Sequence, residues 1–425
     1  MTRFSRLQKS IKVNADFYDD IEKEKILKNS SNDAIIKIIP SIIEISTPEF
    51  LTYYLFRNKR YYPKKYSHYD VISRYIKKAY DDIYDYVTFN GQSINTNPEL
   101  DAEDPHQTGL IGESVGLSTI SRIYDCIEAD WAPIPERRGR GAPSTFDYQY
   151  YLASTGKELI QVECKGTAVN KESLKDNAST HKSDILDKKQ KLDKFAITNA
   201  DPFPANMRYG TITSIDFRSD RILKCWITDP DPEQIKENAY RFKLLTRLKF
   251  LRDWIAFISP RSQFSASLNT RVGCLENIKN PQELNEIPLK KINGEHFELI
   301  PKYARSNEYT FFTNKSNVDD GSAAGHVLKL SENDLFFMGI REDLFILASK
   351  QNFEKILTFN YSSDSMDKTI ECVFRVNRFK ELNLPEDKLP RLNRSKEHVR
   401  FLLKGQIHYS ASGLVFGILP IPKEE

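Results

Sequence analysis

The residues of this 425-residue chain with the clearest chemical potential lie in one strand-like segment, GKELIQVECKGT at 156–167. Glu163 and Lys165 are two positions apart, and such residues project from the same face of a β-strand because successive side chains alternate. A carboxylate and an ammonium group on one face are typical of part of an active site. The alternative is a surface ion pair at a strand end, which contributes only about 0–1 kcal/mol and does no chemistry.

A second strand-like run, TFDYQYYLAS, precedes this segment, and a short turn around Thr155 and Gly156 predicts a β-hairpin. With the turn centred near residue 155, antiparallel pairing sets Asp147 opposite Glu163. Two facing carboxylates are destabilising unless a cation lies between them. Hard divalent cations prefer oxygen ligands, so the pair predicts a site for Mg²⁺, with Mn²⁺ as a substitute.

The hairpin carries a family signature. Asp147, followed on the second strand by Glu163, Cys164 and Lys165, resembles the PD-(D/E)XK motif, the active site of nucleases with the restriction-endonuclease-like fold. The proline of that motif is not directly before Asp147, because Pro143 lies four positions earlier. The resemblance implies an α/β (α+β) fold in which helices flank a central mixed β-sheet.

The same resemblance implies roles for individual residues. Asp147 and Glu163 would bind Mg²⁺, the backbone carbonyl of Cys164 would be a further ligand, and Lys165 would orient or help deprotonate the attacking water. Family members often add a glutamate from the first helix, and Glu113 in IGESVG has the matching place, where it would bind the metal directly or through water. The alternative for Glu113 is a carboxylate that only stabilises the helix N-terminus.

The elements that must position these residues are predicted from periodicity. GLIGESVGLSTISRIYDCI is an amphipathic helix with Glu113 on its apolar stripe, ADWAPIPE is a short edge strand, and STHKSDILDKKQKLDKFA is a basic helix after the hairpin. RYGTITSIDF and RILKCWITD form two further strands, and ENAYRFKLLTRLKFLRDWIAFIS closes the region as a helix. The order of helix, three antiparallel strands, helix and further strand is similar to the core of the family.

Composition divides the chain into three regions. Residues 1–107 are expected to be mainly helical, with helices in STPEFLTYYLFRNKR and HYDVISRYIKKAYDDIYDYV, and residues 108–258 are expected to form the nuclease core. Residues 259–425 are expected to be an α+β region for target recognition or oligomerisation, with strands such as HVLKL, LFFMGI, TIECVFRV and GLVFGILPI.

Basic residues near the hairpin predict contacts with nucleic acid. A glycine-containing loop, ERRGRGAPST, and the basic helix at STHKSDILDKKQ could both reach phosphates, because Arg and Lys bind phosphate oxygens. The alternative is solvated surface in both cases. The predicted contact residues are Arg137, Arg138, Arg140, Lys182, Lys189 and Gln190.

Composition excludes several other classes of protein. The five cysteines are scattered without a CxxC pair, which argues against a disulfide framework and a structural zinc site. There is no run of about 18 apolar residues and no apolar signal region, so we expect a cytoplasmic protein without a membrane segment. Net charge is only +3, so any nucleic-acid binding must come from local clusters.

The sequence therefore predicts a Mg²⁺-dependent DNA endonuclease, with a restriction or anti-phage defence role implied by the resemblance. RNA is left open as a substrate. A homo-oligomer, such as a dimer, and a partner protein from a defence system are expected by analogy. Two alternatives stay open: a repair or recombination nuclease such as a junction resolvase, and a non-catalytic nucleic-acid-binding or assembly module that keeps the fold.

Overall fold

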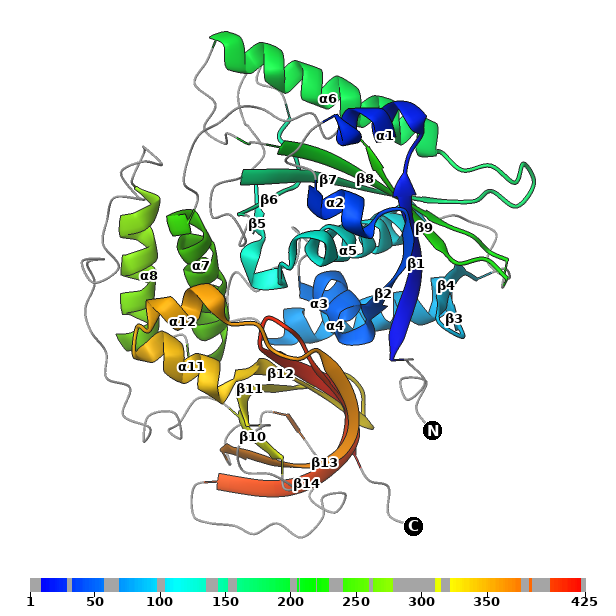
Figure 1. Cartoon of the computed structure of the whole chain (residues 1–425). Coiled ribbons are helices and arrows are strands. Elements are labelled where there is room, and N and C mark those ends of the chain that lie inside the picture. Colours follow the sequence, from blue (N-terminus) through cyan, green and yellow to red (C-terminus); the bar gives the residue numbers. More distant parts are fainter. Residues whose placement is uncertain are drawn as a thin grey trace.

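The computed structural model combines a helix-flanked β-sheet with a closed β-barrel (Figure 1). No helix in the described part of the chain is both long enough and apolar enough to cross a membrane. The residues that the structure describes are 9–28, 33–56, 69–97, 104–134, 144–151, 159–198, 205, 207–218, 220–228, 240–259, 263–277, 310–314, 322–375, 382–383 and 398–421.

The central sheet has seven strands in the order β2-β1-β9-β8-β7-β6-β5. The pairs β1–β9 and β7–β8 are parallel and the other neighbours are antiparallel, so the sheet is mixed. In spatial order the strands are β2 Ser41–Ser46, β1 Ser10–Phe17, β9 Leu223–Thr228, β8 Met207–Ile215, β7 Leu159–Ala168, β6 Tyr148–Tyr151 and β5 Ala132–Pro133.

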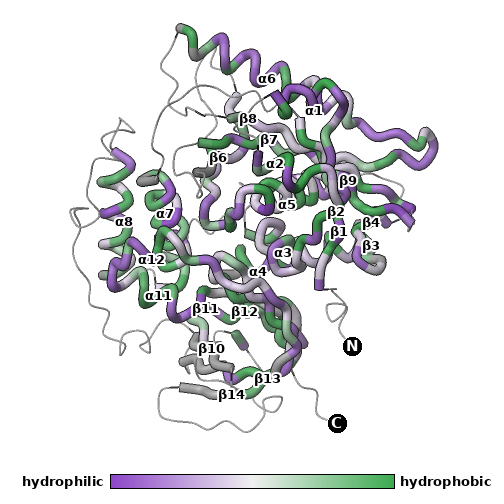
Figure 2. Tube along the Cα trace, in the orientation of Figure 1, coloured by the Kyte–Doolittle hydropathy of each residue, from purple (hydrophilic) through white to green (hydrophobic). Residues whose placement is uncertain are grey.

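Helices α5, Pro105–Tyr124, and α6, Ala178–Thr198, lie on opposite faces of this sheet (Figure 1). Helix α5 starts where the Asp104 side chain accepts the amide of His106, and it ends at Asp125, which has φ 52°. Figure 2 shows alternating hydrophilic and hydrophobic bands along α6, as expected for a helix with one buried face.

The predicted elements between residues 105 and 258 are all present, in the predicted order. The helix, edge strand, hairpin, basic helix, second strand pair and closing helix correspond to α5, β5, β6–β7, α6, β8–β9 and α7, which spans Tyr240–Ile258. Strand β5 is at the edge of the sheet, where a proline such as Pro133 is tolerated although it has no N–H to donate to a neighbouring strand.

The N-terminal region contains the predicted helices and also contributes two strands that were not predicted. The two predicted helices are present as α3, Thr47–Phe56, and α4, Tyr69–Tyr86, but β1 and β2 join the central sheet. Strand β1 alternates buried and half-buried residues, the period-2 pattern of a strand with one covered face. Its parallel partner β9 is about two hundred residues later in the chain, so the sheet does not begin at the predicted boundary of residue 108.

Four shorter N-terminal elements and a one-turn helix complete this part of the structure. They are α1 Asp20–Leu27, α2 Asp33–Ile38, the β3–β4 hairpin of Val87–Asn90 and Ser93–Thr96, and the 3₁₀-helix η3 at Glu128–Asp130.

The C-terminal region forms a closed barrel, which the sequence did not predict. The neighbours run β10-β11-β12-β15-β14-β13, and two short helices, α11 Glu342–Ser349 and α12 Phe353–Thr358, pack near α7 and α8, Gln263–Glu276. The barrel strands are β10 Thr310–Asn314, β11 Ala323–Lys329, β12 Asp334–Arg341, β13 Asp364–Arg375, β14 His398–Tyr409 and β15 Leu414–Pro420.

One hydrophobic cluster runs from the sheet into the barrel. Phe56, at the end of α3, makes edge-to-face contacts with Trp254 of α7 and Phe416 of β15, at ring-centroid distances of 5.3 and 5.1 Å. These contacts join the three predicted regions into one packed body.

Candidate active site

The register of the β6–β7 hairpin sets the geometry of the site. Tyr148 pairs with Val162 and Tyr151 with Leu159, which confirms the register predicted from the sequence. Continued by one residue, this register brings Asp147 opposite Glu163. The amide of Cys164 donates to Asp147 Oδ2 at 3.2 Å, so the aspartate is tied to the strand that carries the glutamate.

Glu163 is a buried carboxylate held by two lysines. Its side chain is 1% exposed, with Lys165 Nζ 2.8 Å from Oε1 and Lys188 Nζ 2.5 Å from Oε2. Lys165 reaches it along β7 and Lys188 reaches it from α6. The burial rules out the alternative of a surface ion pair, because one partner is removed from water.

Strand alternation separates this cluster from Cys164. The thiol is buried on the α5 side, where a Cβ on Gly116 would lie 3.1 Å from Sγ. Burial raises the pKa of the thiol well above its ordinary value, and the charges of Asp147, Glu113 and Glu163 add to the shift. The thiol therefore stays protonated. Three carboxylates lie close enough to influence its pKa through their charges.

The electrostatics of the pair Glu163 and Lys165 follow from burial and mutual attraction. Burial raises the pKa of Glu163, and the nearby charge of Asp147 raises it further, against the opposing effect of the two ammonium groups. Burial acts to lower the pKa of Lys165, but the ion pair with Glu163 outweighs it and the net shift is upward. Lys165 is therefore a cation at neutral pH.

Helix α6 presents one polar stripe to this cluster. His181, Asp184 and Lys188 are spaced at i, i+3 and i+7, so they share a face. Asp184 helps raise the pKa of Lys165, whereas burial and the charge of Lys165 lower the pKa of His181. The same side of the helix buries Ile185, whose methyl groups would meet a Cβ placed on Gly210 of β8. This packing fixes the helix rotation that aims Lys188 at Glu163.

Lys188 contacts Glu163, and the sequence analysis did not select it as a site residue. We expected Lys189 and Gln190 near the site, but Lys189 is buried at 7% exposure and Gln190 is exposed. Successive residues of a helix are rotated by about 100°, so the side chains of Lys188 and Lys189 point in different directions from the helix axis. The sequence contained one indication of this contact, because Lys188 shares a helix face with His181 and Asp184 at spacings of i, i+3 and i+7.

Helix α5 brings Glu113 beside the strand through a close approach of two glycines. A Cβ on Gly112 would clash with the backbone of Gly166, and a Cβ on Gly166 would clash with the carbonyl of Thr108. Glu113, next to Gly112, is half-buried and close enough to affect the Cys164 thiol. The structure thus places Glu113 near the hairpin, and its role as a metal ligand stays a prediction.

The hairpin offers oxygen atoms, which are the ligand type that hard divalent cations prefer. Asp147 and Glu163 offer carboxylate oxygens, and the Cys164 carbonyl points to the Asp147 side, because the N–H and C=O of one strand residue face the same neighbour. Within the described ranges, however, no three His, Cys, Asp or Glu side chains stand in a metal-holding geometry. Glu163 Oε2 is instead bound by Lys188, so a metal ion would have to replace that ammonium group.

The predicted nucleic-acid contacts have different outcomes. The Lys182 side chain makes its contacts within the protein. Its Nζ lies 2.6 Å from a carboxylate oxygen of Asp19, 3.3 Å from one of Glu22 and 4.7 Å from the centre of the Tyr18 ring. It anchors α6 to α1, which leaves its side chain 16% exposed. Arg137, Arg138 and Arg140 lie outside the described residues.

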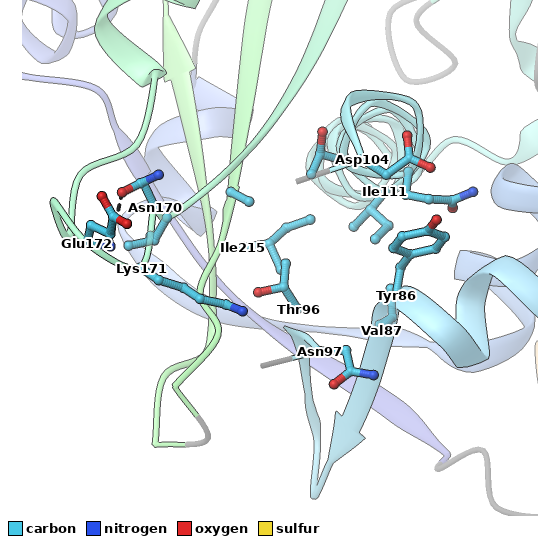
Figure 3. A pocket seen from close by; sticks show the side chains of 14 residues that line it. Tyr86, Val87, Thr96, Asn97, Asp104, Ile111, Asn170, Lys171, Glu172 and Ile215 are labelled. Carbon is cyan, nitrogen blue, oxygen red and sulfur yellow. Dashed lines mark hydrogen bonds between the residues drawn. The ribbon is translucent and has the colours of Figure 1, made fainter. Parts of the chain in front are cut away.

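A cavity of about 160 Å³ lies beyond the far end of β7, away from the hairpin end (Figure 3). Tyr86, Asp104, Ile111 and Lys171 are among its lining residues, which come from α4, the start of α5 and the loop after β7. None of the four predicted catalytic residues lines it. The paired carboxylates therefore identify the candidate site, and the cavity does not.

Comparisons with protein-family models, with curated proteins and with solved structures each find no match.

Proposed function

We propose that this chain is a metal-dependent nuclease of the PD-(D/E)XK type, which hydrolyses the phosphodiester bonds of DNA. The observation that carries the proposal is the β6–β7 register, which brings Asp147 beside Glu163 and leaves Lys165 bound to the same carboxylate. Two acids and a lysine from one hairpin supply metal ligands and a water-side cation.

The arrangement of elements supports the same proposal. Helix α5 precedes three antiparallel strands, α6 follows them, and β8 then pairs in parallel with β7, so the strand order is β5-β6-β7-β8. Helices α5 and α6 cover opposite faces. This is the order expected for a restriction-endonuclease-like core, within a larger mixed sheet that also takes β1, β2 and β9.

Each residue has a specific task in the proposed reaction. A bound Mg²⁺ ion would lower the pKa of a coordinated water and offset the charge that develops on the phosphate. Asp147, Glu163 and the Cys164 carbonyl would hold that ion, and Glu113 would reach it from α5. The Lys165 ammonium group, kept in place by Glu163, would orient the attacking water and stabilise negative charge near the scissile bond.

Further parts of the proposal follow from the resemblance alone. DNA as the substrate, a homodimer that cuts both strands, a cytoplasmic location and a role in restriction or anti-phage defence belong to this group.

One observation favours a second candidate, a non-catalytic nucleic-acid-binding or assembly module. Both oxygens of Glu163 are bound by lysines, and such a balanced cluster can serve the fold without chemistry. In that case the charges would stabilise the packing of α6 on the sheet and no ion would enter.

A cleavage assay separates the two candidates. Purified protein is incubated with plasmid DNA, single-stranded DNA and RNA, with Mg²⁺ or with EDTA. The nuclease predicts metal-dependent cleavage that Asp147→Asn abolishes and that Asp187→Asn, an exposed carboxylate on α6, leaves unchanged. Salt-sensitive binding without cleavage of any substrate would instead identify the binding module.

A further inference from the structure

The contact between Lys188 and Glu163 joins two separate elements at the candidate site. Glu163 holds an ammonium group on each of its two oxygens. Lys165 is on the same strand as Glu163, two residues away. Lys188 comes from another element and adds a second cation at 2.5 Å to a carboxylate that is 1% exposed.

Lys188 and a divalent cation would compete for the same oxygen. Mg²⁺ binds oxygens at about 2.0–2.1 Å in strict octahedral geometry, which leaves no room for an ammonium group that already contacts Glu163 Oε2. The two cations would also repel each other at such short range, in surroundings that screen charge less than water does.

The two lysines are attached to the protein differently. The backbone of Lys165 lies in β7, two residues from Glu163 on the same face, so its amine stays within reach of Glu163 Oε1. Lys188 has a long flexible side chain, 19% exposed, that extends from α6 past the ring of Phe146 at 5.8 Å from its centre. It therefore has a route from the buried carboxylate to the protein surface.

We propose that Lys188 occupies the metal position on Glu163 in the metal-free protein, and that an incoming divalent cation displaces its amine toward the phosphate backbone of the substrate. Lys188 is then a positioning residue. It keeps Glu163 paired while no metal is present, and it adds a phosphate contact once metal has bound. This inference rests on the proposed nuclease function and adds to it a link between metal binding and substrate binding.

Metal affinity provides the test, measured by titration calorimetry with Mg²⁺ and Mn²⁺ in the absence of nucleic acid. Lys188→Met removes the competing cation and is expected to tighten metal binding roughly tenfold. Lys188→Arg keeps a cation that can bind both carboxylate oxygens and is expected to weaken it. The matched control is Lys191→Met on the same helix, which loses an equally short 2.5 Å ion pair that is more than half exposed and should leave the affinity unchanged.

A second measurement uses the wild-type chain, so it does not depend on folding of the variants. Acylation of lysine amines, followed by mass spectrometry, is expected to show faster labelling of Lys188 when Mg²⁺ is added, with Lys191 unchanged. Adding non-cleavable DNA should then protect Lys188.

The outcomes separate the two proposals. If the wild-type protein binds Mg²⁺ and cleaves DNA, but Lys188→Met binds the metal no more tightly and Mg²⁺ does not speed labelling, the displacement is refuted and the nuclease stands. If the wild-type protein neither binds a divalent cation nor cleaves any nucleic acid, the proposed function fails and the inference fails with it.

Discussion

Asp147 Oδ2 accepts the amide of Cys164, the residue between Glu163 and Lys165. One hydrogen bond thus connects the first strand of the hairpin to the middle of the ExK segment on the second. The register of the hairpin sets Asp147 opposite Glu163, so this bond holds the aspartate beside the glutamate.

Two substitutions at the hairpin are expected to reduce cleavage for different reasons. Asp147→Asn removes a proposed metal ligand and should lower metal affinity by at least about 10- to 100-fold. Lys165→Met should leave metal bound and lower the cleavage rate constant by about 10²- to 10⁴-fold, because it removes the water-side cation. Metal titration and single-turnover cleavage distinguish the two losses, and equal metal affinities for both variants would contradict these roles.

The approach of α5 to β7 predicts opposite effects for two glycines on one helix. Gly112→Ala is expected to lower the free energy of unfolding by at least about 1–3 kcal/mol, because the added Cβ meets the Gly166 backbone. Gly109→Ala has open space around it and should raise this free energy by about 0.5–1 kcal/mol through helix propensity. Urea denaturation measures both, and a Gly112→Ala variant as stable as wild type would refute the close contact.

A buried ion pair joins η3 to α7. Asp130 accepts two hydrogen bonds from Arg247, at 2.6 and 3.0 Å. Arg247 also donates to the carbonyls of Ile356 and Phe359 at 2.9 Å, which links α7 and η3 to α12. Burial acts to raise the pKa of Asp130, but Arg247 outweighs it and the net shift is downward.

Removing one partner of this pair is expected to be severe. Arg247→Met leaves a buried carboxylate without its main cation and should reduce the free energy of unfolding by about 3–5 kcal/mol. The exposed pair of Lys191 and Asp187 is the comparison, and Lys191→Met should cost no more than about 0.5 kcal/mol in the same urea titration. Similar losses in the two variants would show that the burial of Asp130 has no energetic consequence.

A pH dependence is expected from the barrel. Burial lowers the pKa of His408 from 6.5 to about 3, and its Nδ1 lies 2.8 Å from Ser365 Oγ. Between these pKa values the unfolded chain binds a proton at this residue and the folded chain does not, so acidification favours unfolding. The contribution lost as the pH falls from 6.5 toward 3 is at most about 1.4 kcal/mol per pH unit.

The variant His408→Asn should remove this slope. Free energies of unfolding, measured in urea at a series of pH values, are compared between variant and wild type. Glu49 acts in the opposite sense, because burial raises its pKa to about 7 and its contribution falls as the pH rises from 4.5 to 7. Its effect is the same in both proteins and cancels in the difference, so parallel pH curves would contradict a neutral buried His408.

Local chemistry in the sequence determined the hairpin. Alternation of side chains placed Glu163 and Lys165 on one face and Cys164 on the other, and the position of the turn set Asp147 opposite Glu163. These relationships depend on neighbours in the chain, so composition and periodicity were sufficient. The order of elements from α5 to α7 was accessible for the same reason.

Tertiary structure decided what covers the hairpin. The rotation of α6 on the sheet is fixed by the contact of Ile185 with β8 near Gly210, and this rotation selects Lys188 over Lys189 as the partner of Glu163. The addition of β1 to the sheet depends on pairing with β9, and the barrel depends on closure between β10 and β13. Such contacts join residues far apart in the chain, and their free energy comes from packing of whole surfaces, which no local pattern encodes.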